Sequence, residues 1–368
     1  MAAVRHCRNV LLGLALLLAP ALGMAQQAIS PVVFTALNSA QQAQQKGDLA
    51  QARRLLDSAL EQAPAGSLEL ALIQQRLGYV AISAGQYEAA IGWLRKALAH
   101  DRLEPEAARQ DRLNLAQLLA SREEFAEAAR LLEQERRQAG LNLEQTQLLV
   151  QCYSRLREYR RAIPLAEEVV RANAAADDVW YQLLVGMSYE QGDHGRAAQW
   201  QKVLLKRDPA RAEHWRQLAA LQSQAGEQRA AAATLRLAHE AGVGLGARDL
   251  DNLVALQVNA GAPWQAARLL EELMAQQLLP RDAAHQERLA QLWTLARDRQ
   301  RAREAWAALA NGSNRADHWL RVAGFQLEDG QWQELLGTLK RAQSGASAQQ
   351  RQLIRQWEGY AQSALDNS

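Results

Sequence analysis

The chain has 368 residues, of which 48% are hydrophobic and 22% charged, and its 42 basic and 40 acidic residues leave a formal net charge of +2. A nucleic-acid-binding protein needs clustered Lys and Arg to neutralise phosphates. Here charges of both signs alternate, as in Arg122-Glu123-Glu124, which is typical of solvated helix faces. The composition therefore argues against a nucleic-acid partner.

The first residues predict a secretory signal peptide over 1–25. Arg5 and Arg8 precede an apolar stretch from Val10 to Ala19, and the small residues Gly23 and Ala25 precede the expected cleavage point after Ala25. An uncleaved membrane anchor is the weaker alternative, because a spanning helix needs about 20 apolar residues. We expect an exported, periplasmic protein with no membrane span after cleavage.

Only Cys152 would remain after removal of the segment that carries Cys7, so no intrachain disulfide can form. Cys152 lies in an apolar stretch, which favours a buried small hydrophobic side chain over a reactive thiol. Stability must then come from packing. Removal of Arg5 and Arg8 would also leave equal numbers of basic and acidic residues.

Residues 26–368 are occupied by nine copies of a helix-turn-helix unit. The residues equivalent to Gly85, here called turn residues, are Gly47, Gly85, Glu123, Arg157, Gly192, Gly226, Gly261, Arg297 and Gly330. The predicted units lie near 32–65, 70–103, 109–139, 143–174, 178–211, 212–243, 247–278, 283–312 and 316–343. A final segment, 347–365, starts another helix without a second one to pair with it, and is expected to cap the array.

Small residues recur at fixed distances from the turn residue. Five residues after it stand Ala52, Ala90, Ala128, Ala162, Ala197, Ala231, Ala266, Ala302 and Leu335. Seven residues before it the side chain is Ala, Gly or Val in every copy. We interpret both positions as the crossing point of the two helices, where a larger side chain would overpack the hairpin.

With a period near 34 residues and these small residues, the chain resembles the tetratricopeptide repeat (TPR) family over about residues 32–343. The resemblance implies an all-α, right-handed superhelical solenoid of about nine hairpins plus a C-terminal capping helix. It also implies a protein that binds and positions other proteins.

Residue patterns for chemistry are weak. The His residues of the mature chain are spread over the units without metal-ligand spacing, so no metal site is predicted. Gly242-Val243-Gly244-Leu245-Gly246 follows a predicted helix rather than a strand, which favours a linker over a phosphate loop. No catalytic residue and no cofactor are expected, and an enzyme would need a site built across several repeats.

In TPR arrays the first helix of each hairpin lines an inner groove. The matching positions here predict a neutral, amide-rich surface: Gln75, Tyr79, Gln117, Gln147, Gln151, Gln182, Tyr189, Arg216 and Ser223. Family members that clamp an acidic C-terminal peptide use Lys and Arg at such positions, and only Arg216 fits. Glutamines, which both donate and accept hydrogen bonds, suit the backbone of an extended peptide better.

Part of the chain, from Trp180 to Ala310, resembles exported TPR proteins encoded beside TonB, ExbB and ExbD in Gram-negative bacteria. The motifs that carry this resemblance are Trp215-Arg216-Gln217-Leu218, 237–242, Asn252-Leu253 and 262–270, the last with Pro263 in place of the usual aromatic residue. It implies a periplasmic accessory of a TonB-dependent uptake system. The alternative is a scaffold for assembly of a pilus, an exopolysaccharide or the outer membrane.

Overall fold

The computed structural model describes residues 29–173 and 176–366. The described residues form helices only. These are α1 (Pro31–Gln45), α2 (Leu49–Leu60), α3 (Leu68–Ser83), α4 (Tyr87–Ala99), α5 (Pro105–Ser121), α6 (Phe125–Gln138), α7 (Leu143–Arg155), α8 (Tyr159–Ala172), α9 (Asp178–Glu190), α10 (His194–Arg207), α11 (Ala212–Gln224), α12 (Gln228–Glu240), α13 (Ala247–Asn259), α14 (Pro263–Ala275), α15 (Ala283–Leu295), α16 (Arg299–Ser313), α17 (Ala316–Glu328), α18 (Trp332–Ala342) and α19 (Ala348–Asp366).

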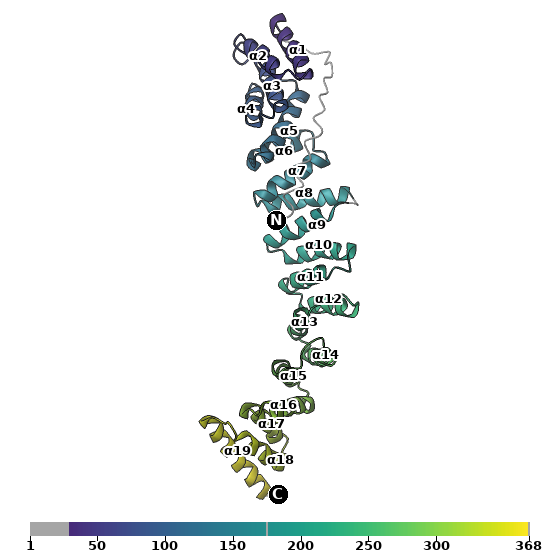
Figure 1. The fold of residues 1–368 in the computed structure, drawn as a ribbon, viewed down its shortest axis with the longest axis vertical. Coiled ribbons are helices and arrows are strands. Elements are labelled where there is room, and N and C mark those ends of the chain that lie inside the picture. Colours follow the sequence, from purple (N-terminus) through teal and green to yellow (C-terminus); the bar gives the residue numbers. More distant parts are fainter. Residues whose placement is uncertain (1–28, 174–175, 367–368) are drawn as a thin grey trace. The chain divides into compact units, whose positions relative to one another are not determined.

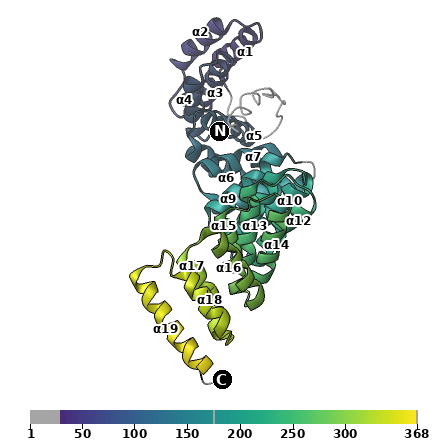
Figure 2. The same ribbon diagram turned by 60° about the horizontal axis from the view of Figure 1, so that its bottom comes forward.

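Helices α1 to α18 follow one another along the chain as nine consecutive pairs, here called hairpins one to nine, each with a first helix A, a turn residue and a second helix B. The chain divides into two compact blocks, one ending at Gly192 and one starting at Asp193, so the fifth pair falls at the boundary. Within each block the helices stack in chain order (Figure 1). At the C-terminal end, α19 packs against α17 and α18 (Figure 2). The predicted all-α solenoid of helical hairpins with a capping helix is confirmed.

Side-chain caps begin many of the helices. Asp48, Ser67 and Asp193 each accept a hydrogen bond from a backbone N–H of the first helical turn. Asn142 and Gln145 form a reciprocal capping box at the start of α7. These caps satisfy N–H groups that a helix leaves without an internal partner.

Every turn residue ends its helix A with a positive φ. The six glycines have φ between 69° and 81°, and the three others adopt the same conformation: Glu123 at 66°, Arg157 at 59° and Arg297 at 58°. The residue that follows each of these three donates its N–H to the carbonyl five residues earlier, for example Glu158 to Tyr153 at 2.9 Å. This is the Schellman closure of a helix, which favours glycine at the left-handed position. The repeat geometry therefore persists where the glycine is lost.

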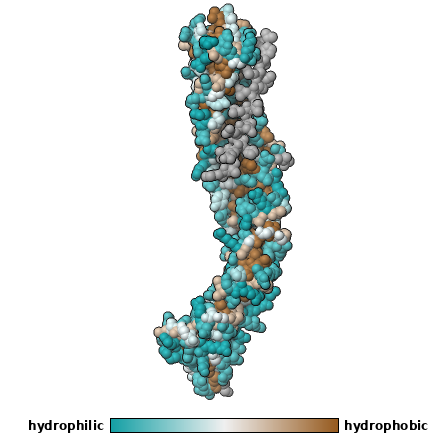
Figure 3. Space-filling view, in the orientation of Figure 1, coloured by the Kyte–Doolittle hydropathy of each residue, from teal (hydrophilic) through white to brown (hydrophobic). Residues whose placement is uncertain are grey.

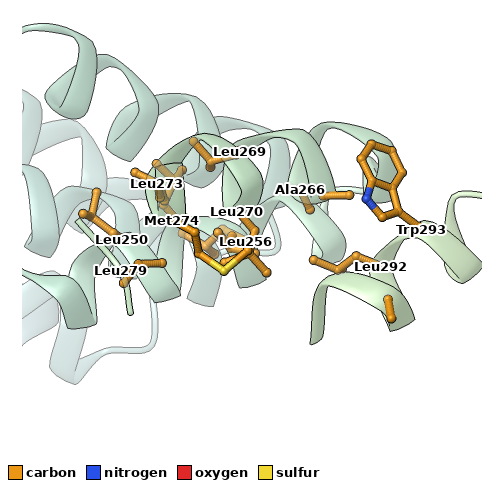
Figure 4. Close-up of a cluster of buried hydrophobic side chains, with 14 of the residues drawn as sticks. Leu250, Leu256, Ala266, Leu269, Leu270, Leu273, Met274, Leu279, Leu292 and Trp293 are labelled. Atoms are coloured by element: carbon orange, nitrogen blue, oxygen red, sulfur yellow. The ribbon is translucent and has the colours of Figure 1, made fainter. Parts of the chain in front are cut away.

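The small residues lie where the hairpin helices pack. All nine residues five positions after the turn residue are 0% exposed. Seven positions before it, eight of the nine residues are buried, and Val185 is half-buried. Around Ala266 the side chains of α14, among them Leu269, Leu270 and Leu273, join a core that extends from Ala219 to Val322 (Figure 4). Hairpins six to eight thus share a continuous core, as expected for a solenoid, and the last hairpin forms a second cluster of buried side chains with α19.

The first three hairpins differ from the rest in the length of helix A. These helices have 15, 16 and 17 residues, whereas helix A has 13 residues in each later pair, as in α7 and α17. The wider spacing of the first turn residues is therefore extra helix. The fifth helix also begins at Pro105, earlier than the predicted start of that unit near 109.

The predicted signal peptide lies outside the described residues. Among the helices that the structure describes, none combines the length and the apolar character of a membrane span. Hydrophilic side chains cover much of the face shown in Figure 3, with hydrophobic ones scattered between them. Cys152 is 0% exposed, and burial raises its pKa to about 12, as predicted for a buried, unreactive thiol.

Candidate protein-interaction site

The nine predicted groove residues lie at three positions of helix A: ten, six and three residues before the turn residue. Residues separated by four and then three positions share one face of a helix. In the N-terminal block these positions hold Gln75, Tyr79, Gln117, Gln147, Gln151, Gln182 and Tyr189, and in the C-terminal block they hold Arg216 and Ser223. We call this face the helix-A stripe of each block.

Gln75 and Tyr79 of α3 bind a buried carboxylate on α5. Gln75 Nε2 donates to Asp111 Oδ2 at 2.7 Å, and Tyr79 Oη donates to Asp111 Oδ1 at 2.5 Å. Asn114 Nδ2 donates in turn to Tyr79 Oη at 3.0 Å. Asp111 is 0% exposed. These two groove residues therefore join neighbouring A helices and are not available to a partner.

Burial dominates the protonation of this network. It raises the pKa of Asp111, although hydrogen bonds from Tyr79 and Gln75 oppose the shift. Burial and the neighbouring Asp111 also raise the pKa of Tyr79, and burial lowers that of Arg76. The Tyr79 hydroxyl thus keeps its proton and serves as a donor.

In the C-terminal block, Arg216 and Ser223 also have internal partners. Arg216 forms ion pairs with Glu213 at 2.9 Å and with Asp249 of α13 at 3.1 Å, and these hydrogen bonds raise its pKa. Ser223 Oγ is bonded to Gln228 across the hairpin turn. Arg216 was the one groove residue suited to a carboxylate clamp, and its charge is already neutralised.

The remaining glutamines of the N-terminal block form the part of the stripe that is open to a partner. They are Gln117 on α5, Gln147 and Gln151 on α7, and Gln182 on α9. Gln151 and Gln182 are exposed, and the other two are half-buried. Within the described part of the chain, none of the four side-chain amides makes a hydrogen bond to protein. We call these four residues the glutamine row.

Two buried carboxylates of hairpin three were not singled out by the sequence analysis. Asp111 is one, and the other is Glu135 of α6, which is 1% exposed and pairs with Arg112 and, at 3.4 Å, with Arg109. Glu135 stands twelve residues after its turn residue, where Ala59, Ala97 and Ala238 stand in other hairpins. This departure from the repeat pattern could have identified Glu135 from the sequence.

Across residues 29–173 and 176–366, no group of three or more His, Cys, Asp or Glu side chains is arranged to hold a metal ion. A pocket of about 390 Å³ opens between α6, α7 and α8, lined by residues that include Tyr153 and Arg161. It lies apart from the positions of the glutamine row, since none of the four glutamines lines it.

Solved TPR structures are similar to this chain at low sequence identity. A TPR protein from Parabacteroides merdae is 16% identical, with 72% of this chain and 99% of that chain covered and a TM-score of 0.37. The TPR domain of P58(IPK) is 18% identical, with 91% of this chain and 98% of that chain covered and a TM-score of 0.28. MamA from Desulfovibrio magneticus RS-1 is 18% identical, with 46% of this chain and 93% of that chain covered and a TM-score of 0.33.

No protein-family model and no curated protein matches the sequence. The TPR-type fold is therefore assigned from the molecule's own features: paired helices, nine turn residues with positive φ, and nine fully buried small or aliphatic residues at the helix crossing. An array of this kind is a scaffold suited to binding proteins.

Proposed function

We propose that this protein is an exported adaptor that binds an extended segment of a partner protein through the glutamine row. The observation that carries the proposal is a set of four carboxamides on three consecutive A helices, each ten or six residues before the turn residue, that make no hydrogen bond within the described residues. A carboxamide can donate to a backbone carbonyl and accept from a backbone N–H at the same time.

The spacing of the row suits an extended chain. Packed helices lie about 8–10 Å apart, and an extended chain rises about 3.3 Å per residue. About three residues of an extended peptide would therefore pass each A helix. Helices α5 and α7, which carry three of the four glutamines, are in contact.

The charge of the stripe disfavours the alternative of an acidic C-terminal tail. Such a tail needs free cations, and Arg216, which belongs to the C-terminal block, is held by Glu213 and Asp249. Neutral hydrogen bonding to a backbone supports a partner segment of little net charge.

As the partner we propose a component of a TonB–ExbB–ExbD energy-transduction system, in the periplasm. Support comes from the expected signal peptide and from the resemblance of the region 180–310, including Pro263 at the start of α14, to exported TPR proteins of such systems. The rival role is a scaffold for envelope assembly.

The test is co-purification from cells that express the tagged full chain together with TonB, ExbB and ExbD. We expect enrichment of at least one component by the wild-type protein. Loss of two net hydrogen bonds of about 1 kcal/mol each should weaken binding roughly 10-fold or more in Gln147→Ala/Gln151→Ala. The matched control, Gln199→Ala/Gln333→Ala, removes two exposed glutamines of B helices.

Three outcomes are informative. Enrichment by the wild type and the control but not by the stripe variant supports the whole proposal. Equal enrichment by all three proteins would exclude the glutamine row as the binding surface. No enrichment of any component would exclude the TonB assignment and leave the envelope scaffold as the better account.

A further inference from the structure

Hairpins four and eight each contain an arginine stacked on an aromatic ring at equivalent positions. Tyr153 and Trp293 both stand four residues before the turn residue, and both are 1% exposed. Arg161 and Arg301 both stand four residues after it. The guanidinium of Arg161 lies 4.2 Å from the centre of the Tyr153 ring, and that of Arg301 lies 4.8 Å from the Trp293 ring.

A glutamate of the preceding helix B completes each cluster. Tyr153 Oη donates to Glu133 Oε1 at 2.8 Å, and Trp293 Nε1 donates to Glu271 Oε1 at 3.3 Å. Glu133 and Glu271 both stand ten residues after their own turn residues. The α6–α8 cluster (Glu133, Tyr153, Arg161) and the α14–α16 cluster (Glu271, Trp293, Arg301) are therefore equivalent.

The two clusters differ at a neighbouring position, three residues after the preceding turn residue. In the C-terminal block this residue is Trp264, whose ring meets Trp293 edge to face at 6.2 Å and 76°. The guanidinium groups of Arg268 and Arg301 lie 5.9 Å and 5.8 Å from the centre of the Trp264 ring. Trp264 thus supplies an aromatic ring to the α14–α16 cluster.

In the N-terminal block the same position holds Ala126, and the space beside the cluster is open. The pocket of about 390 Å³ is lined by Ala126, Arg130, Tyr153 and Arg161. These four residues are the counterparts of Trp264 and of the three side chains that surround it. The pocket accordingly has counterparts of the three side chains around Trp264, which is itself 45% exposed, but lacks the ring.

We propose that this pocket receives an aromatic side chain from a partner polypeptide, in the way that the α14–α16 cluster holds Trp264. The buried ring of Tyr153 offers an edge-to-face contact, and two guanidinium groups can lie against the faces of a guest ring. An anionic guest fits less well, because Arg161 is already bound by Glu158 at 2.8 Å and faces Glu133. This site is separate from the glutamine row and does not rest on it.

The probe is N-acetyl-L-tryptophanamide, which is neutral and resembles a tryptophan within a chain, titrated into the full chain and followed by ligand-observed NMR. N-acetyl-L-leucinamide serves as the aliphatic control. We expect saturable binding of the tryptophan probe alone. Ala126→Trp should abolish it by placing an indole where Trp264 lies in the other cluster. Arg160→Trp, which adds an exposed indole outside the pocket, should leave it unchanged.

The reverse change should create a site. Trp264→Ala opens the second cluster, and we expect this variant to bind a second equivalent of the probe. If Ala126→Trp does not fold, as judged by its thermal melt, Ala126→Phe and the Trp264→Ala stoichiometry carry the same test. Equal binding by wild type and Ala126→Trp, or no saturable binding by the wild type, would overturn the proposal.

Free indole distinguishes the source of the ring. A partner side chain requires that the probe with its flanking amides binds at least as tightly as indole. Binding of indole at least 10-fold more tightly than the amide probe would contradict a polypeptide guest and indicate a small aromatic ligand.

Discussion

The hydroxyl of Tyr79 donates a hydrogen bond of 2.5 Å to Oδ1 of Asp111, and so ties helix A of hairpin two to helix A of hairpin three. The acceptor is a fully buried carboxylate whose pKa is raised, chiefly by burial. Tyr79, which the sequence analysis placed in the groove, therefore helps to hold two repeats together.

This bond predicts a pH dependence. Because the pKa of Asp111 is higher in the folded than in the unfolded chain, its contribution to stability is fully present below the unfolded value near 3.8. That contribution is lost as the pH rises through the folded value. We expect the unfolding free energy of the wild type, relative to Asp111→Asn, to fall as the pH rises above about 4. Urea titrations at several pH values measure this difference, and a difference that rises with pH would contradict it.

The turn residues that are not glycine predict a gain in stability. Arg157 and Arg297 have φ of 59° and 58° and are exposed, and a side chain in this conformation costs about 1 kcal/mol or more. Arg157→Gly and Arg297→Gly should each raise the unfolding free energy by up to about 1 kcal/mol. Gln199→Gly, in an exposed helix interior, should lower it by about 0.5–1 kcal/mol. Losses of similar size in all three variants would contradict the role of φ.

Packing at the helix crossing can be tested at Ala266, which is 0% exposed in the core of the C-terminal block (Figure 4). Ala266→Leu should destabilise the protein by about 1–3 kcal/mol through overpacking. Ala233→Leu, at an exposed position of α12, should change stability by less than about 0.5 kcal/mol. Thermal or chemical denaturation compares the two, and equal effects would show that the crossing tolerates a larger residue.

Cys152 should resist modification in the folded protein. Burial keeps its side chain inaccessible and raises its pKa to about 12, so that little thiolate forms near neutral pH. Iodoacetamide at about pH 8 should leave the Cys152 peptide unmodified in native protein and label it in urea, as read by mass spectrometry. Rapid labelling in the native state would contradict this account.

The sequence predicted the fold well because each weak pattern, such as a glycine turn or a small residue, recurs at the same place in most of the nine units. Glu123, Arg157 and Arg297 carry no glycine signature, yet their distance from the buried alanines identifies them as turn residues, and all three have positive φ. The regular spacing of the repeat identified these residues where the type of side chain did not. The small residues were likewise readable, since only close helix approach requires them at a fixed distance.

The candidate site could be predicted less well from the sequence, because it depends on contacts between repeats. Helical spacing places Gln75 and Gln147 at the same position, but only the structure shows that Asp111 binds the first and that the second makes no bond within the described residues. The counterpart relation between Trp264 and Ala126 needed the geometry of both clusters. The side chains of neighbouring helices therefore determine which amides remain open to a partner.

The central claim is that the glutamine row binds the partner. The most direct measurement places a photo-crosslinking amino acid, p-benzoylphenylalanine, at Gln151, and in a matched control at Gln199, in cells that contain TonB, ExbB and ExbD. The account predicts a crosslink from position 151 to one of these three proteins and none from position 199. Crosslinks from position 199 alone, or the same crosslinks from both positions, would contradict it.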